Sequence, residues 1–333
     1  MKKICFIVPY FGKLPNYFQL FLQSCKYNPD YTWLIFTDDE TSYNYPSNVT
    51  KISMTFEKLK DIISNKFEFQ VALDTPYKLC DFKPTYGYIF EDYLNDYKFW
   101  GHCDIDTIMG NLNHFLTDDF LEKYDKIFAL GHMTIYKNTY ENNRVFMKEY
   151  KGRSLYQEYL TDPQNRIFDE DCLNEYNIHN IFKNHNKKVF EGDFSLNLYY
   201  NNLKFIRTYY VGLNNAPKSH GHLIEKYRKA LYLWKNGNIV RFFAYKKQLK
   251  AEQFLYIHFQ GRKMTIMLKS AETNTIRISP NLFTCFNNNI SLAFVSKCKP
   301  IVAYRGLLRE ACVYSLRNMK VIKSKLIDKL RNR

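Results

Sequence analysis

The chain has 333 residues and a mass of 40.0 kDa, and 46% of its residues are hydrophobic and 17% aromatic. This composition excludes an intrinsically disordered protein, and the length suits one large α/β domain. No run approaches the roughly 18 apolar residues that cross a bilayer, which argues against a membrane-spanning protein.

The net charge of +15 is unevenly distributed. Residues 218–250 hold nine Lys/Arg against Glu225, and residues 299–333 hold ten against Glu310 and Asp328. Each segment carries +8, so the rest of the chain is close to neutral. The basic character belongs to the C-terminal half.

The eight cysteines are scattered, with no C-x-x-C pair and no zinc-like spacing. Many lie in apolar stretches, as reduced core cysteines do. The first apolar run, residues 4–11, ends at Gly12-Lys13 without a signal-peptide cleavage pattern, so we expect a buried first strand. These features predict a cytoplasmic protein.

Predicted strands and helices alternate through the N-terminal half. We expect strands over residues 3–12, 32–40, 98–106 and 126–131, and helices over residues 16–28, 56–67 and 85–97. Such alternation predicts an α/β fold with a Rossmann-like, mostly parallel central sheet and helices on both faces. In these sheets, ligands bind beyond the carboxyl ends of the strands.

The C-terminal half is predicted in less detail. Residues 151–260 have a polar, helix-rich pattern, with a strand expected at "LKFIRTYYVG", so we expect a helical insertion over about 138–250. Residues 265–286 alternate and contain turn residues, which predicts a hairpin or an edge. An apolar stripe from Leu308 to Leu330 predicts a basic amphipathic helix. The expected units are a catalytic domain over 1–264 and an extension over 265–333.

The segment "FWGHCDIDTIMGNL" (99–112) holds the first candidate site. Asp104 and Asp106 follow an apolar strand and precede a turn at Gly110-Asn111. Two carboxylates that converge there are hard oxygen ligands for Mg²⁺ or Mn²⁺. Capping of a turn is the ordinary alternative for such a pair. Other polar groups also follow predicted strands and are expected in the same crevice: Pro9, Tyr10, Asp38 and Asp39.

Two later stretches complete the candidate site. "RIFDEDCLNEYNI" holds Asp169, Glu170, Asp171 and Asn174, for which helix capping is the alternative. "YIHFQGRKM" holds His258 in an apolar run, where a core histidine is the ordinary interpretation. In this second stretch, Gly261 allows a close backbone approach and Lys263 suits a phosphate; imidazole with two carboxylates favours Mn²⁺.

Taken in order, these motifs resemble the GT-A glycosyltransferases, especially the retaining family 8 enzymes and bacterial polysaccharide relatives. The family's D-x-D with a downstream Gly-Asp/Asn-Leu is matched at residues 104–112, its D-Q-D-x-L-N by "DEDCLN" at 169–174, and its H-x-x-G-x-x-K at residues 258–263. Glu170 stands where the family has Gln, and Lys263 comes one residue early. The likeness covers roughly residues 1–264.

The resemblance implies a role for each motif. The metal ligands would be Asp104, Asp106 and His258, holding Mn²⁺ (or Mg²⁺) on the diphosphate of a nucleotide-sugar donor. Asp169 and Glu170 would face the transferred sugar, with retention by a front-face reaction. The remaining donor contacts would come from Pro9, Tyr10, Asp38, Asp39, Lys83, Tyr86, Asp104, Asp171, Asn174, Gly261 and Lys263. The acceptor would be a glycan or a lipid-diphosphate-linked oligosaccharide.

The basic segments and the D-x-D motif also suit other interpretations. A cationic helix fits the anionic inner face of the plasma membrane, unless it packs on the domain. A nucleic-acid-binding protein is the alternative class, but the chain has no RNP, KH, helix-turn-helix or zinc-finger signature, so no nucleic acid is expected. "DIDTI" nearly fits the nucleophile motif of haloacid-dehalogenase-like phosphatases, although that motif lies on a first strand. We predict a metal-dependent glycosyltransferase of bacterial polysaccharide synthesis, most naturally using a UDP-sugar.

Overall fold

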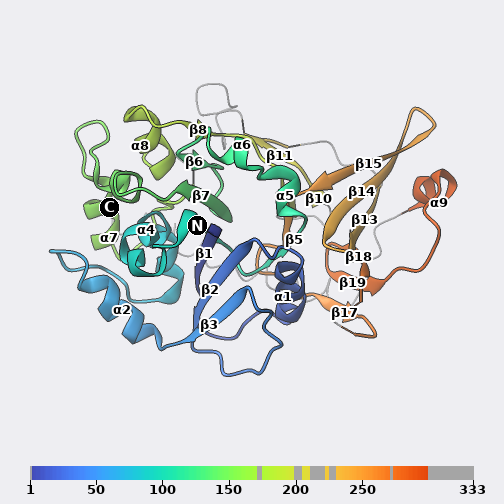
Figure 1. Ribbon diagram of the computed structural model, residues 1–333, viewed down its shortest axis with the longest axis horizontal. Helices are drawn as coiled ribbons and strands as arrows, with labels where there is room; N and C mark the ends of the chain where they lie inside the picture. The colour runs from blue at the N-terminus through green and yellow to red at the C-terminus, as the bar shows by residue number, and fades with distance from the viewer. Residues whose placement is uncertain are drawn as a thin grey trace, which may run out of the picture.

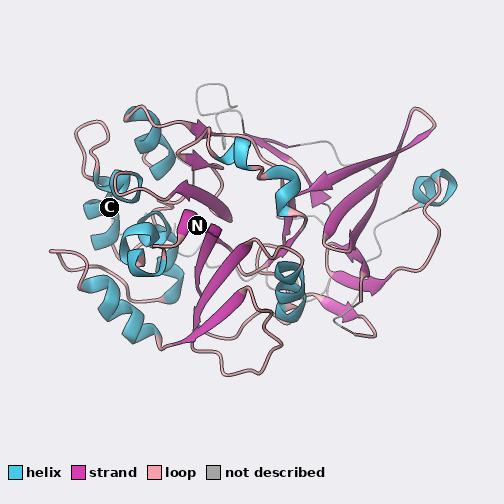
Figure 2. Ribbon diagram, viewed as in Figure 1, coloured by secondary structure: helices cyan, strands magenta, loops and turns pink. Residues whose placement is uncertain are grey.

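The computed structural model describes residues 2–170, 175–198, 205–210, 222–224, 230–270 and 273–298. Strands within these residues gather in two groups, shown in magenta in Figure 2, and helix α1 (Phe18–Lys26) lies between the groups. The α/β class predicted from the sequence is confirmed. The division into domains at residue 264 stays a prediction.

The central sheet of the described chain has seven strands in the order β3-β2-β1-β4-β7-β6-β8. Strands β3, β2, β1 and β4 run parallel, whereas β7 is antiparallel to both β4 and β6. The sheet is therefore mostly parallel, as expected. Its strands are β1 (Lys2–Pro9), β2 (Tyr31–Thr37), β3 (Val49–Ser53), β4 (Tyr97–Cys103), β6 (Lys126–Ile127), β7 (Met133–Lys137) and β8 (Val189–Phe190).

Alternating residues of β1 feed two hydrophobic cores, one on each face of this sheet. Ile4, Phe6 and Val8 pack with α1 on one face, and Cys5 and Ile7 pack with a second group of helices on the other. They are α2 (Phe56–Ser64), α3 (Leu79–Phe82), α4 (Tyr86–Ile89), α7 (Leu155–Thr161) and α8 (Ile178–Asn184), with 3₁₀ turns η1 (Pro76–Lys78), η2 (Lys83–Thr85), η3 (Glu91–Tyr93) and η4 (Asn142–Met147). Figure 1 shows α2, α4, α7 and α8 of this group beside the sheet.

A small sheet extends the end of β4 toward the C-terminal half. Its order is β10-β9-β16-β5, from β10 (Phe205–Ile206), β9 (Leu196–Leu198), β16 (Tyr256–His258) and β5 (Thr107–Met109). Two short helices, α5 (Leu112–Phe115) and α6 (Asp118–Leu121), follow β5. The nearby strands β11 (Thr208–Tyr210) and β12 (His222–Ile224) pair antiparallel. The strand expected at residues 203–212 is confirmed as β10 and β11.

The second group of strands corrects the helical interpretation of residues 151–260. Helices α7 and α8 lie in that range, but residues 230–254 form an antiparallel meander. The missed signal is Asn236-Gly237, where both residues have positive φ (47° and 79°) in a two-residue turn between apolar runs. The six-stranded sheet comprises β15 (Gln248–Phe254), β14 (Asn238–Tyr245), β13 (Ala230–Lys235), β18 (Thr275–Ser279), β19 (Leu282–Cys285) and β17 (Thr265–Met267).

The hairpin expected within residues 265–286 is confirmed as the antiparallel pair β18–β19. Helix α9 (Leu292–Lys297) then packs on this sheet, capped by the Ser291 hydroxyl, which accepts from the Phe294 N–H. The amphipathic helix predicted from Leu308 to Leu330 lies outside the described residues. None of the helices in the described ranges has the length and hydrophobicity needed to cross a bilayer.

Candidate active site

The paired aspartates lie beyond the carboxyl end of β4. The Asp104 N–H donates to the His132 carbonyl over 2.9 Å, which ties the turn to the start of β7. The Thr107 hydroxyl donates to the Asp104 carbonyl over 2.8 Å and closes the turn. The chain thus reverses between the two aspartates and β5, and both carboxylates stay near the end of the parallel strands.

The pairing of β16 with β5 brings His258 to the aspartates from about 150 positions away in the sequence. His258 lies opposite Thr107 in this antiparallel ladder. Its Nε2 lies 3.4 Å from Asp106 Oδ2 and 3.8 Å from Asp104 Oδ2. One ligand atom from each of the three residues falls within 4.8 Å of the others. The sequence-predicted metal ligands therefore form one cluster.

In this cluster, attraction between opposite charges shifts the pKa values more than burial does. Burial raises the pKa of Asp106, but His258 and the Gly261 N–H lower it below its ordinary value. Burial lowers the pKa of His258, yet Asp106 and Asp104 raise it overall. Two carboxylates and an imidazole, arranged to attract positive charge, are a donor set that fits Mn²⁺ or a similar divalent ion. An ion bound there would replace the imidazole proton.

Two further side chains hold His258. Its Nδ1 lies 3.1 Å from Asn197 Oδ1, and its ring stacks on His132 at a centroid distance of 4.6 Å and an interplanar angle of 26°. Nδ1 of His132 lies 2.5 Å from the hydroxyl of buried Tyr256. These partners could not be identified from the sequence, because they come from three separate strands or loops.

Lys83 connects the cluster to the second acidic motif. Its Nζ lies 2.8 Å from Asp104 Oδ1 and 3.1 Å from Asp169 Oδ2, and it donates to the Gly131 carbonyl over 2.8 Å. The Gly131 N–H donates to Glu170 Oε2 over 2.9 Å. A Cβ on Gly131 would come within 2.4 Å of Asp169 Oδ2, so a side chain at this position would have to displace that carboxylate. Asp169 and Glu170 thus face the same site as Asp104.

The charges around Lys83 shift in opposite directions. Burial raises the pKa of Asp169 to about 7, with Lys83 opposing the rise and Glu170 adding to it. Burial lowers the pKa of Lys83, but Asp104 and Asp169 raise it well above its ordinary value. Lys83 is therefore a permanent cation among three carboxyl groups. The raised pKa allows Asp169 to take up a proton near neutral pH.

The residues predicted at the ends of β1 and β2 lie on one loop system. Tyr10 is half-buried, and burial, followed by the charges of Asp106 and Asp39, raises the pKa of its hydroxyl. Asp38 is exposed, and its Oδ1 accepts the Gly12 N–H over 2.7 Å. Asp39 is buried with its two oxygens accepting from Leu14 and Thr41 N–H groups. Asp39 therefore shapes the loop, whereas Pro9, Tyr10 and Asp38 remain accessible.

The other predicted contacts divide between the site and the core. Gly261, at a φ of 67°, donates its N–H to Asp106 Oδ2, and Lys263 is exposed just beyond it. Tyr86, by contrast, is 2% exposed in the helical core, with its hydroxyl donating to the Leu79 carbonyl over 3.2 Å. This burial gives Tyr86 a packing role in place of the sugar contact. Asp171 and Asn174 lie outside the described residues.

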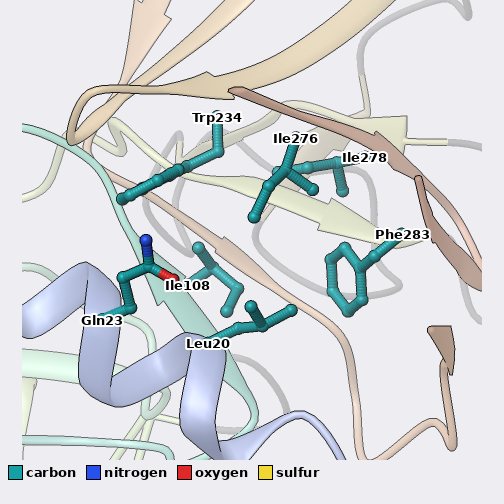
Figure 3. A pocket seen from close by; sticks show the side chains of 7 residues that line it. All are labelled: Leu20, Gln23, Ile108, Trp234, Ile276, Ile278 and Phe283. Carbon is teal, nitrogen blue, oxygen red and sulfur yellow. The ribbon is translucent and has the colours of Figure 1, made fainter. Parts of the chain in front are cut away.

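A small apolar cavity lies apart from this polar site. Figure 3 shows it between α1 and the C-terminal sheet, where Leu20 and Gln23 face Trp234, Ile276 and Phe283. The Trp234 indole N–H donates to the Met109 carbonyl over 3.0 Å nearby. The lining contains none of the acidic residues, so this cavity belongs to the packing between α1 and the second sheet.

Comparison with known proteins identifies the family. The model of DUF6625, a family of unknown function, matches residues 6–287. The chain belongs to this family. No curated protein matches the DUF6625 chain.

Among solved structures, the DUF6625 chain is similar to a crystal structure of the galactosyltransferase LgtC in complex with donor and acceptor sugar analogues. The identity is 11% and the TM-score 0.31, with 59% of this chain and 75% of that chain covered. A crystal structure of an active-site mutant of LgtC matches with 10% identity and a TM-score of 0.29, and the match covers 59% of this chain and 75% of that chain.

Proposed function

We propose that this DUF6625 protein is a metal-dependent glycosyltransferase of GT-A architecture. It would move a sugar from a nucleotide-diphosphate sugar to a glycan or lipid-linked acceptor. One observation carries the proposal: Asp104, Asp106 and His258 meet beyond the carboxyl end of a parallel strand. That edge of an open α/β sheet is where nucleotide ligands bind.

The donor diphosphate would lie over the cluster. Asp104, Asp106 and His258 would hold Mn²⁺ or Mg²⁺, which when bound offsets the charge of the departing diphosphate. The Gly261 backbone and exposed Lys263 would contact the same phosphates from the loop after β16. Further along the crevice, the accessible Pro9, Tyr10 and Asp38 would line the pocket for base and ribose.

The transferred sugar would lie over Lys83, Asp169 and Glu170. Glu170 would stabilise positive charge that develops at the anomeric carbon as the bond to the diphosphate breaks. Lys83 would orient Asp169 and add positive charge near the leaving oxygen. A retaining outcome and a role in bacterial polysaccharide synthesis follow from the resemblance to family 8 enzymes and form part of this proposal.

The test is hydrolysis and transfer with a panel of UDP-, GDP- and CDP-sugars in the presence of Mn²⁺. We expect activity with one donor and its loss in EDTA. Asp106→Asn should abolish it with the fold intact, since loss of a ligand from a diphosphate-bound ion removes several kcal/mol of stabilisation, on the order of 1000-fold in rate. Asp30→Asn, an exposed aspartate on the loop before β2, is the matched control. Full activity in EDTA would contradict the metal requirement.

We also propose that an anionic membrane surface is a partner. The turn of the β14–β15 hairpin exposes Lys246 and Lys247, and Lys250 follows on β15. Each cation near such a surface contributes about 1 kcal/mol. In a sedimentation assay, binding to anionic vesicles should weaken for the double variant Lys246→Ala/Lys247→Ala and for a chain lacking residues 305–333. Unchanged binding of both variants would contradict the proposal.

A further inference from the structure

His258 is held by neighbours on both sides of its strand, in addition to its approach to Asp104 and Asp106. His258 and Asn197 are register partners in the parallel pairing of β16 with β9, so their side chains project from one face of the small sheet. On the other side of β16, Thr107 pairs with His258 and continues directly from Asp106. The small sheet therefore places Asn197 behind the imidazole and the aspartates in front of it.

The hydrogen bonds of Asn197 decide which imidazole nitrogen faces the acids. Asn197 is 5% exposed, and its Nδ2 donates to Ser195 Oγ over 3.2 Å. That bond leaves Oδ1 as the acceptor for His258, which requires a hydrogen on Nδ1 of the imidazole. Nε2 then turns its lone pair toward Asp104 and Asp106 whenever the ring is neutral. This is the tautomer that a metal ion at Nε2 needs.

His132 limits the rotation of the same ring. Its imidazole stacks on His258 at 4.6 Å, and its own carbonyl accepts the Asp104 N–H. The preceding residue lies at the other half of the site, since the Gly131 carbonyl accepts from Lys83 and the Gly131 N–H donates to Glu170. The dipeptide Gly131-His132 thus touches both halves of the site. Residue 132 is 8% exposed, so these contacts are made inside the protein.

We propose that Asn197 and His132 are positioning residues for His258: Asn197 fixes its tautomer and His132 fixes its ring plane, so that Nε2 is presented to a divalent cation. The proposal rests on the proposed function, because the cation is the one assigned to Asp104, Asp106 and His258. Partners that orient a metal-bound histidine are commonly worth 10–100-fold in metal affinity.

The experiment measures the dissociation constant of Mn²⁺ for the full chain by electron paramagnetic resonance titration, without any sugar nucleotide. Asn197→Leu removes the acceptor at nearly constant volume and should weaken Mn²⁺ binding by about 10–100-fold. Asn197→Asp keeps an acceptor oxygen and should restore binding. For the stack, His132→Ala should weaken binding by about tenfold, and His132→Phe, which keeps an aromatic ring, should recover most of it.

Asn143→Leu is the matched control, because Asn143 is 6% exposed and accepts from the Trp100 indole N–H over 2.7 Å, in the helical core. It should lower the melting temperature and leave Mn²⁺ affinity unchanged. If Asp106→Asn abolishes Mn²⁺ binding but folded Asn197→Leu and His132→Ala bind Mn²⁺ with unchanged affinity, the positioning roles are overturned. Absence of Mn²⁺ binding in the unaltered protein also overturns the positioning roles, whereas full transfer activity in EDTA overturns the metal-dependent function itself.

Discussion

Lys78 and Lys83 lie five positions apart, yet their surroundings differ in one decisive respect. Lys78 is 3% exposed and donates to Asp81 Oδ2 over 2.7 Å. Its other acceptors are two backbone carbonyls, and the two oxygens of Asp81 also receive backbone N–H groups. These contacts involve Tyr159, Gln164, Arg166 and Phe168. One cation meets one anion, and every bond is made within the protein.

Around Lys83 the charges do not balance. Its single ammonium lies between Asp104 and Asp169, with Glu170 held next to them by Gly131. The balanced pair at Lys78 stabilises the turn that leads to the second acidic motif. The excess of carboxylates at Lys83 leaves the site able to attract further cations. A buried lysine therefore has a structural role where its charge is balanced by one carboxylate, as at Lys78. It indicates a functional site where carboxylates outnumber cations, as at Lys83.

The largest expected effect is on the balanced pair. Lys78→Met leaves Asp81 buried without a cation and should lower the free energy of unfolding by about 3–5 kcal/mol. Mn²⁺ affinity of the molecules that stay folded should not change, because the metal cluster is built on other elements. Denaturant titration measures the loss, and Lys58→Met, an exposed position on α2, is the control. Equal stability of both variants would break the comparison.

Lys83→Met should lower activity more than stability, the reverse of what is expected for Lys78→Met. Removal of the ammonium from the acidic site should reduce transfer by about 100-fold, the usual loss for one charge-stabilising donor. Stability should fall less than for Lys78→Met, because Asp169 can take up a proton in place of its cation. Paired kinetics and melting curves test this, with Lys83→Arg retaining part of the activity. A larger stability loss at Lys83 would reverse the comparison.

Gly131→Ala tests how closely the carboxylates must approach Lys83. The added Cβ would lie 2.4 Å from Asp169 Oδ2 and must push that side chain away. We expect a loss of about 1–3 kcal/mol in stability, typical of overpacking, together with slower transfer. In the double variant with Asp169→Ala the stability loss should shrink, since the clash is gone. Additive losses in this cycle would contradict the proposed contact.

The last comparison concerns pH. The pKa of Asp169 is about 7 in the folded chain, above its ordinary value of 3.8, because of burial. The folded state keeps a proton that the unfolded state releases, so this stabilisation is full below pH 3.8 and is lost as the pH rises to about 7. Asp169→Asn should flatten that part of the stability curve. An unchanged slope between pH 4 and 7 would show that Asp169 titrates normally.

Much of the site was predictable because its parts are local. Apolar runs alternate with amphipathic segments, and this periodicity predicts strands, helices and a parallel sheet. Asp104 and Asp106 follow such a run directly, so their place at the sheet edge could be inferred from the sequence. The confinement of carboxylates and an imidazole to three short motifs also indicated a cation site before any contact was known.

The meeting of these motifs was decided by tertiary structure. The register of β16 against β5 sets His258 beside the aspartates, and that pairing joins residues far apart in the sequence. Gly131, His132 and Asn197 carry no local signature, because their roles depend on which side chains arrive from other strands. Tyr86 shows the same dependence, since its helix turns the ring into the core. Local periodicity determines elements and edges, whereas only non-local pairing determines which charged groups become neighbours.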